Sequence, residues 1–184
     1  FVTLLRPGSP VAAQGWQVLS QGPATLVDDG GVITLSTTTT GGSTSGMQLL
    51  RYALDAGPSF AIRVELEVAA VNTHNQFDAA AAILGRHSTF YGDSTDRAQM
   101  VFLDSASVGW ADDSQSFATP IVDAGTRVYE LAVDAGTATF SVDGVPRLTR
   151  TNFATNGVIA IGDQTNDLNV DSTLHVRAVS LICQ

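Results

Sequence analysis

The chain has 184 residues, of which 44% are hydrophobic and 15% are charged, a composition typical of a globular protein. It has 18 acidic residues and nine basic ones, all of them arginines. The resulting net charge of −9 argues against binding to a phosphate backbone or an anionic membrane surface. The absence of lysine excludes Schiff-base chemistry and a P-loop, and no apolar run is long enough to span a bilayer.

Alternating apolar and polar residues predict β-strands along most of the chain. The clearest strand is 60–71, in which Phe60, Ile62 and Val64 fall on one face and Arg63 falls on the other. One apolar face and one polar face are typical of an antiparallel sheet. The other predicted strands, in chain order, are residues 16–20, 31–37, 47–54, 79–86, 97–104, 127–133, 137–142, 157–163 and 172–182.

Turn signals separate these strands. Asp143-Gly144 and Ala135-Gly136 predict two tight hairpins, and the Ser-, Thr- and Gly-rich residues 36–46 predict a surface loop. No segment shows sustained helical periodicity with a capping box. Ten to twelve strands with short connections predict an all-β fold, an antiparallel two-sheet jelly-roll β-sandwich, and we expect residues 1–184 to form one domain.

Three isolated features give further expectations. Trp16 opens the first strand and is expected in the core. Cys183 is either a buried strand thiol or a partner for a cysteine outside this chain. The histidines form no closely spaced pair, which argues against a zinc site. Because the chain starts at Phe1 without a signal peptide, we expect a processed mature protein or an excised domain. The fold type and the acidic composition lead us to expect that it is secreted or surface-exposed.

Two stretches resemble a known superfamily. Residues 127–181 (RVYELAVDAGTATFSVDGVPRL through to the final strand) and residues 15–37 (GWQVLSQGPATLVDDGGVITLST) are similar to the closing and opening strands of the concanavalin A-like lectin/glucanase superfamily, which includes laminin-G-like jelly rolls. The resemblance implies a concanavalin A-like sandwich whose concave face or rim loops meet glycans or protein partners.

An enzymatic alternative depends on Glu65 and Glu67. The superfamily's glucanases carry an E-x-D-x-x-E or E-x-D-x-E strand, and this pair lacks the central aspartate and the full spacing. Residues i and i+2 place both carboxylates on one strand face about 7 Å apart, near the lower end of an inverting pair's separation. The other interpretation is a solvated strand face with an Arg63–Glu65 ion pair. The lyase motifs R-x-E-x-R and Q-I-H are absent.

Candidate ligand-binding residues come from two polar segments. In residues 86–97, Tyr91 and Asp93 combine an aromatic ring with a carboxylate, the chemistry that binds sugars by stacking and by hydrogen bonds to hydroxyls. Trp110 and Asp112 have the same character, and the two pairs would form one glycan subsite if they lie at the same rim. The alternative is that Trp110 fills the core.

The segment 162–171, GDQTNDLNVD, predicts a calcium loop in part. Asp167, Asn169 and Asp171 match the first half of the EF-hand pattern, but Ser172 and Ala178 occupy the positions of its glycine and its closing glutamate. An EF-hand is therefore excluded, and a structural Ca²⁺ would need ligands from elsewhere, for which the candidates are Asp28 and Asp29. Direct ligand contact and a plain polar turn are the two alternatives.

Three functions follow from these observations. The first is a secreted or cell-surface, lectin-like carbohydrate-binding domain without catalytic activity, which binds a glycan or polysaccharide. The second is a structural or adhesive subunit that self-assembles or binds protein partners, as in a coat, filament or virion decoration. The third is a glycan hydrolase or lyase with Glu65 and Glu67 as its acid/base pair. None involves nucleic acid or membrane insertion.

Overall fold

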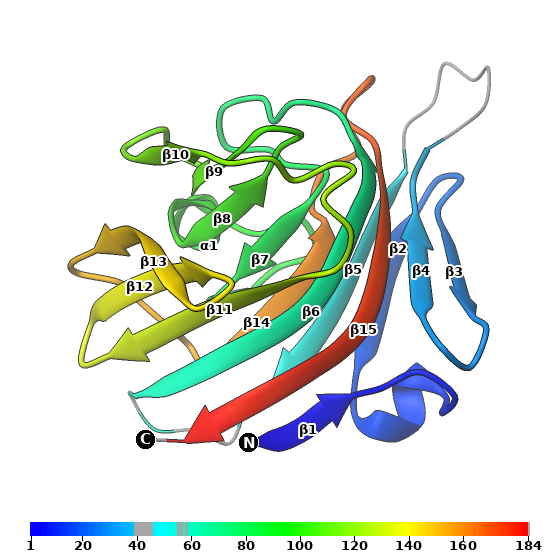
Figure 1. Ribbon diagram of the computed structural model, residues 1–184, viewed down its shortest axis with the longest axis horizontal. Coiled ribbons are helices and arrows are strands. Elements are labelled where there is room, and N and C mark those ends of the chain that lie inside the picture. Colours follow the sequence, from blue (N-terminus) through cyan, green and yellow to red (C-terminus); the bar gives the residue numbers. More distant parts are fainter. Residues whose placement is uncertain (39–45, 55–56, 58, 184) are drawn as a thin grey trace.

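Two antiparallel β-sheets pack face to face in the computed structural model, which describes residues 1–38, 46–54, 57 and 59–183 (Figure 1). The predicted jelly-roll β-sandwich is thereby confirmed. The chain threads back and forth between the sheets, so strands that are distant in sequence are neighbours in each sheet.

Sheet A contains the two longest strands at its centre. They are β6 and β15, which pair along their whole length with two register shifts. Strand β1 pairs with β15 on the side opposite to β6, next to β4. From one edge to the other, sheet A contains β13 (Val145–Arg150), β12 (Thr137–Val142), β11 (Arg127–Asp134), β6 (Phe60–Val71), β15 (Ser172–Cys183), β4 (Ile33–Ser36) and β3 (Thr25–Asp28), with β1 (Val2–Leu5) paired to β15.

Sheet B has seven strands. In order they are β10 (Ser116–Ala118), β9 (Ser107–Trp110), β8 (Met100–Leu103), β7 (Ala82–Leu84), β14 (Val158–Asp163), β5 (Met47–Ala53) and β2 (Gln17–Gln21). Two short helices complete the described elements, the 3₁₀ helix η1 (Val11–Gln14) and the α-helix α1 (Ser94–Ala98). None of the helices in the described part of the chain is long and apolar enough to cross a membrane.

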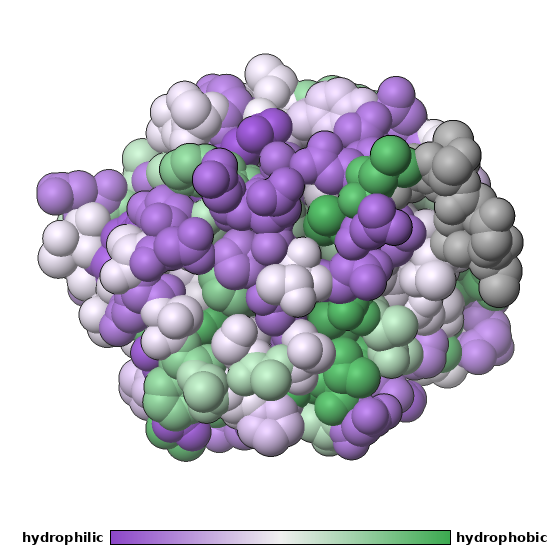
Figure 2. Space-filling model, turned by 90° about the horizontal axis from the view of Figure 1, so that it is seen from above, coloured by the Kyte–Doolittle hydropathy of each residue, from purple (hydrophilic) through white to green (hydrophobic). Residues whose placement is uncertain are grey.

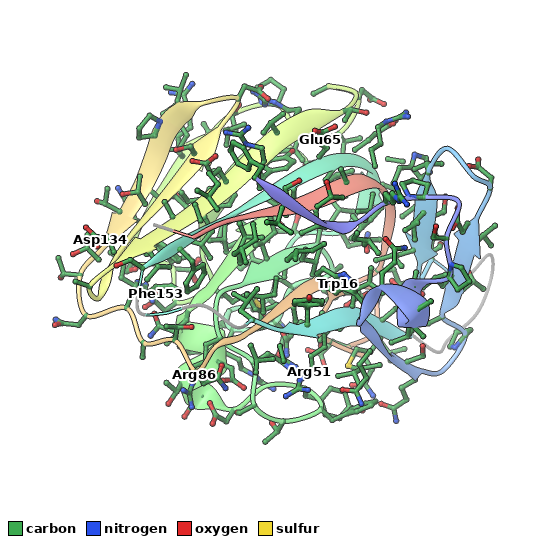
Figure 3. All side chains as sticks on the ribbon, turned by 90° about the horizontal axis from the view of Figure 1, so that it is seen from below. Trp16, Arg51, Glu65, Arg86, Asp134 and Phe153 are labelled. Atoms are coloured by element: carbon green, nitrogen blue, oxygen red, sulfur yellow. The ribbon has the colours of Figure 1, made fainter. Side chains whose placement is uncertain are left out.

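The main core lies between the two sheets. Trp16 is 3% exposed and its indole N–H donates to the Leu4 carbonyl at 2.8 Å, which confirms its predicted core position. Trp16 and Phe153 lie between the sheets near opposite ends of the core (Figure 3). The apolar residues of the alternating strands point inward here, as the period-2 pattern requires.

The two predicted hairpin turns are confirmed. Ala135 and Gly136 have φ of 45° and 83°, and Asp143 and Gly144 have φ of 51° and 77°. Positive φ at both central residues gives the turn a twist that matches the flanking strands. The first turn joins β11 to β12 and the second joins β12 to β13.

Helix α1 corrects the sequence prediction for residues 97–104, which were expected to be strand throughout. Asp93 caps the helix, and Asp93 and Asp96 form a reciprocal capping box. The sequence pattern does not predict this box, because the usual signature has a glutamate or glutamine at the third helical position, where this chain has Asp96. The strand begins only at Met100.

Two sequence expectations fall outside the described residues. Most of the loop predicted at residues 36–46 is among them. The backbone of Cys183 pairs with Phe60 at the end of β15, but its side chain is also not described, so the expectations for its thiol stay as predictions.

Candidate functional site

The outer face of sheet B is covered over much of its area by chain segments. The residues that connect β6 to β7 and β7 to β8 lie against it, and a second apolar cluster forms beneath them. This cluster is made of Leu49, Ala79, Ala82, Leu84, Met100, Phe102, Ala111 and Ala160, with Leu19 at its margin. The middle of this face is therefore filled by apolar side chains.

His74 fixes the β6–β7 connection in place. Its ring stacks on Phe102 with centroids 3.7 Å apart, and its two nitrogens lie 2.9 Å from Asp104 Oδ2 and 2.9 Å from Asp113 Oδ1. Burial alone would lower the pKa of His74, but hydrogen bonds to the two carboxylates outweigh it and raise the pKa. Hydrogen bonds from one imidazole to two carboxylates therefore hold this connection against sheet B.

The β7–β8 connection is organised around Asp96, which is fully buried. Ser88 donates to Asp96 Oδ2 from its backbone N–H at 2.7 Å and from its hydroxyl at 2.6 Å. Arg86 Nε lies 3.0 Å from Asp96 Oδ1. A buried carboxylate with this many partners holds its segment rigidly, and a rigid loop presents its remaining side chains in fixed positions.

A pocket of about 280 Å³ opens where this connection passes beside β2 and β5. We call it the Arg51 pocket; its lining residues are Gln17, Leu19, Arg51, His87, Ser88, Thr89 and Phe90. The Phe90 ring is 41% exposed, and Arg51 Nη1 donates to Gln17 Oε1 at 3.2 Å. Within the described residues Arg51 takes part in no ion pair. Arg51 lies on the side of sheet B that faces away from sheet A (Figure 3).

His87 forms the buried floor of the Arg51 pocket. It is 0% exposed, and neither ring nitrogen has a partner within hydrogen-bond geometry among the described residues. Burial lowers the pKa of His87, and the charge of Arg51 lowers it further; Asp96 and the Phe90 backbone oppose this shift without reversing it. The lowered pKa favours the neutral form of the ring, and both of its nitrogens are buried.

Tyr91 and Asp93, predicted as ligand contacts, have local structural partners. The Tyr91 hydroxyl accepts a hydrogen bond from Asn166 at 3.2 Å, which ties this loop to the β14–β15 connection. Asp93 caps α1, and the Asp96 backbone N–H together with the Ser88 hydroxyl lowers the pKa of its carboxyl. Both residues are next to the Arg51 pocket in sequence, but neither lines it.

Trp110 is fully buried, so its ring offers no face to a sugar. This corrects its prediction as a contact residue and supports the alternative that it fills the core. Asp112 lies nearby at the surface, where it binds Arg150 Nη2 at 2.5 Å. Hydrogen bonds from Ser114 and Arg150 outweigh the effect of burial and lower the pKa of Asp112. Tyr91 and Asp112 thus belong to different clusters.

The glutamate pair lies on the other side of the molecule. Glu65 and Glu67 are on the outer face of sheet A, and Figure 3 shows Glu65 on the side opposite to Arg51. Glu67 Oε2 is 3.5 Å from His175 Nδ1, and Glu65 is exposed. The expected Arg63–Glu65 ion pair is wrong: Arg63 pairs across the sheet with Glu130 at 2.8 Å.

The first residues of the segment 162–171 form a buried polar connection between the sheets. The Thr37 hydroxyl, from the end of β4, donates to Asp163 Oδ2 at 2.6 Å, and Thr165 N–H donates to Asp163 Oδ1 at 3.0 Å. Asp163 is 1% exposed, and burial raises its pKa to about 8. Figure 2 shows the face of the molecule that lies at the top of Figure 1. The side chains on this face are mostly polar, with apolar ones among them.

The predicted calcium ligands do not fit one site. Asp28 and Asp29 form the β3–β4 turn, where their carboxylates accept backbone N–H groups, among them that of Gly8 at 2.9 Å. Asp28 of β3 pairs with Ile33 of β4, and Ile33 pairs with Val176 of β15. Asp171 lies just before β15, which starts at Ser172. Asp171 lies five residues before Val176, so the levels of Asp171 and Asp28 along the strands are roughly 16 Å apart. Antiparallel pairing places the two groups at opposite ends of β4.

The remaining residues of that prediction lie in a turn whose backbone is held by local contacts. Asn169 has a φ of 65°, and the Asp171 N–H donates to Asn72 Oδ1 at 3.1 Å. Asp167 N–H donates to the Thr165 hydroxyl at 3.1 Å. Across the described ranges, no group of three or more His, Cys, Asp or Glu side chains is arranged to hold a metal ion.

Comparisons with known proteins show the fold. No protein-family model and no curated protein sequence matches the chain. Among solved structures it is similar to the VIP36 exoplasmic/lumenal domain in its Ca²⁺/Man-bound form, with a TM-score of 0.68 and 11% identity over 99% of this chain and 89% of that one. The fold is thus concanavalin A-like, as the sequence resemblance implied.

Two further neighbours differ in what their names describe. The potassium-bound carbohydrate recognition domain of Emp46p has a TM-score of 0.58 and 12% identity, over 92% of this chain and 88% of that one. The alginate lyase AlgAT5 of Polysaccharide Lyase family 7 has a TM-score of 0.57 and 12% identity, over 86% and 81%. The same fold therefore occurs in carbohydrate-binding domains and in a polysaccharide lyase.

Proposed function

We propose that this protein is a carbohydrate-binding domain that binds an acidic glycan in the Arg51 pocket. The observation that carries the proposal is an exposed Phe90 ring beside the guanidinium of Arg51, which no carboxylate of the described residues neutralises. An aromatic ring stacks on the C–H face of a sugar, and a free guanidinium binds a carboxylate through two parallel hydrogen bonds.

The setting of Arg51 supports an anionic ligand. The chain has a net charge of −9, and most of its arginines are paired with carboxylates. Among the described residues Arg51 has no carboxylate partner, and it lies beside a buried histidine whose pKa is lowered, so it makes a local basic site on an acidic protein. The hydroxyls of Ser88 and Thr89 and the amide of Gln17 add hydrogen-bonding groups for sugar hydroxyls.

We propose that the protein binds its glycan without cleaving it. The acid/base pair suggested by the sequence lies on the opposite outer face from the Arg51 pocket (Figure 3). The names of the structural neighbours include a Ca²⁺/Man-bound form of the VIP36 domain and an alginate lyase, so both neutral and uronate glycans belong in the test. We expect the protein to work outside the cell or at its surface.

The test is isothermal titration calorimetry with matched trisaccharides of glucuronate, of guluronate and of glucose. We expect a uronate to bind, and Arg51→Gln to weaken that binding at least about tenfold, because a charge-assisted hydrogen bond contributes roughly 1.5–3 kcal/mol. Phe90→Ala should also weaken it, through the lost stacking contact.

Two matched controls distinguish the loss of a specific contact in the Arg51 pocket from the general loss of a positive charge or of exposed apolar surface. Arg6→Gln removes the same charge from another arginine that forms no ion pair with any described residue. Phe77→Ala removes the ring of a residue that is 43% exposed in the β6–β7 connection. Both should bind like the wild type. Equal loss in Arg6→Gln and Arg51→Gln would show an unspecific charge effect and sink the proposal.

Calcium gives a second prediction. The residues of the predicted metal loop and of the β3–β4 turn are too far apart to share an ion, and neither group lines the Arg51 pocket. Uronate affinity should therefore be the same in EDTA and in millimolar CaCl₂. A loss of affinity in EDTA that CaCl₂ restores would contradict the proposed site.

A further inference from the structure

Strand β2 differs from the other strands that lie at an edge of the two sheets. Natural edge strands are usually very short, bulged, charged or interrupted by proline, which keeps them from pairing with another chain. Strand β1 has a register shift against β15, and β13 has one against β12 and contains Pro146 and two arginines. Strand β3 has four residues and ends at the charged Asp28, and β10 has only three residues. Each of these four edges is thus protected.

Strand β2 has none of these protecting features. Its five residues, QVLSQ, pair with β5 without a register shift, and none of them is buried. Within the described part of the chain, β5 is the one strand that pairs with β2, and no other backbone hydrogen bond involves β2. A row of unpaired N–H and C=O groups on an exposed strand is a template for another strand.

The distribution of charge favours a second copy of this chain as that partner. Of the 18 acidic and nine basic residues, none lies between Arg6 and Asp28, and β2 is in the middle of this uncharged segment. Two copies with a net charge of −9 each repel one another, and like charges that face each other across an interface cost free energy. An edge strand without carboxylates avoids that cost.

The sequence of β2 also fits antiparallel pairing with itself. A two-fold axis through Leu19 would place Val18 opposite Ser20 of the second copy, and Gln17 opposite Gln21. Every facing pair is then neutral, and two glutamine amides can bond to each other because each has donors and an acceptor. A contact of this kind uses the same surface on both copies, so it closes at a dimer.

We propose that two copies of this chain pair through β2 and join their B sheets into one continuous sheet. A contact between two strands of five residues is small, so the dimer is a weak one whose population rises with protein concentration. The two-fold axis is perpendicular to the sheet, because the strands pair antiparallel. The outer faces of both B sheets therefore point to the same side of the dimer.

The dimer brings two Arg51 pockets onto one face. Gln17 and Leu19 of β2 line this pocket, and Gln17 pairs with Arg51 of β5. Three strand spacings across the sheet and four residues along it separate the two Arg51 residues by roughly 20 Å. A long polyuronate would reach both pockets, and its second contact would form at a high effective concentration. This last consequence rests on the proposed function, whereas the dimer itself does not.

The test is analytical ultracentrifugation of wild type and charged variants. We expect the wild-type mass to rise from that of a monomer toward that of a dimer between about 10 µM and about 1 mM. Val18→Lys/Ser20→Lys changes two exposed positions that face each other in the dimer, so like charges should keep this variant monomeric. Val18→Glu/Ser20→Glu should be monomeric for the same reason. An equimolar mixture of the two variants should dimerise, because opposite charges then face each other.

The control is Thr25→Lys/Val27→Lys, which adds the same charge at two exposed positions of the edge strand β3 and should dimerise like the wild type. A wild type that stays monomeric at every concentration would overturn the proposal, as would a dimer that persists in both β2 variants. A mixture that stays monomeric, or an equal loss in the β3 control, would also overturn it. Calorimetry with the uronate trisaccharide reports on single pockets, so this proposal and the proposed function fail separately.

Discussion

Asp163→Asn is expected to make the protein more stable at neutral and alkaline pH, and to leave its stability at about pH 4 almost unchanged. Burial raises the pKa of Asp163 to about 8, against an ordinary value of 3.8. The folded state therefore keeps a proton that the unfolded state releases between these two values. The stabilising contribution is complete below the unfolded pKa and is lost as the pH rises through the folded pKa.

The size of this effect follows from the shift. One pKa unit corresponds to about 1.4 kcal/mol, so the wild type should lose about 4 kcal/mol between pH 4 and pH 7 through this group. Asparagine has no proton to lose, and its amide can take the place of the carboxyl between the Thr37 hydroxyl and the Thr165 N–H. Urea unfolding of wild type and variant at about pH 4, 7 and 9 measures the difference.

Asp134→Asn is the matched control, because Asp134 is an exposed aspartate at the end of β11. We expect its stability to follow the wild type at each pH. If Asp163→Asn changes the free energy of unfolding by the same amount at about pH 4 and pH 9, then Asp163 is ionised in the folded protein and the polar connection between the sheets has been misread.

Gly162→Ala should have the largest effect on folding itself. Gly162 has a φ of 131°, and a Cβ atom there would lie 2.3 Å from the Gln48 carbonyl oxygen of the paired strand β5. Backbone strain and overpacking each cost roughly 1–3 kcal/mol, and the clashing atom is main chain and cannot rotate away. We expect a loss of roughly 3 kcal/mol or more in urea unfolding.

Gly31→Ala is the comparison for this variant, because its added Cβ would meet only Asp29 Oδ1 at an ordinary 3.5 Å. It should lie within about 1 kcal/mol of the wild type. A Gly162→Ala protein with wild-type stability would mean that β14 and β5 can separate at this point without loss.

The sequence predicts the fold well where alternation is long. Residues 60–71 and 137–142 match β6 and β12 residue for residue, because one face of each strand is core and the other is not. Short strands such as β9 and β10 are not predicted, because three or four residues are too few to show an alternation of apolar and polar residues. The sequence also does not predict that position 162 requires glycine, because this requirement comes from the close backbone of β5, a strand distant in sequence.

The candidate site was predictable only in part. The aromatic segment around Phe90 was recognised from composition, and it does border a pocket. Arg51 is not predictable as a site residue from the sequence, because the lack of a carboxylate partner among the described residues is a property of the fold. Trp110 and Asp112 looked alike in the sequence, yet one lies in the core and the other at the surface. The turn at Asp28 could not be placed relative to Asp171 before the strand pairing was known.

The most direct test of the central claim, that an acidic glycan binds in the Arg51 pocket, is a titration of ¹⁵N-labelled protein with a uronate trisaccharide. We predict shifts of the Arg51 Nε–H and His87 ring signals that saturate together, while the Arg6 and Arg147 signals stay in place. Saturating binding that leaves Arg51 and His87 unshifted, or shifts Arg6 and Arg147 instead, would contradict the claim.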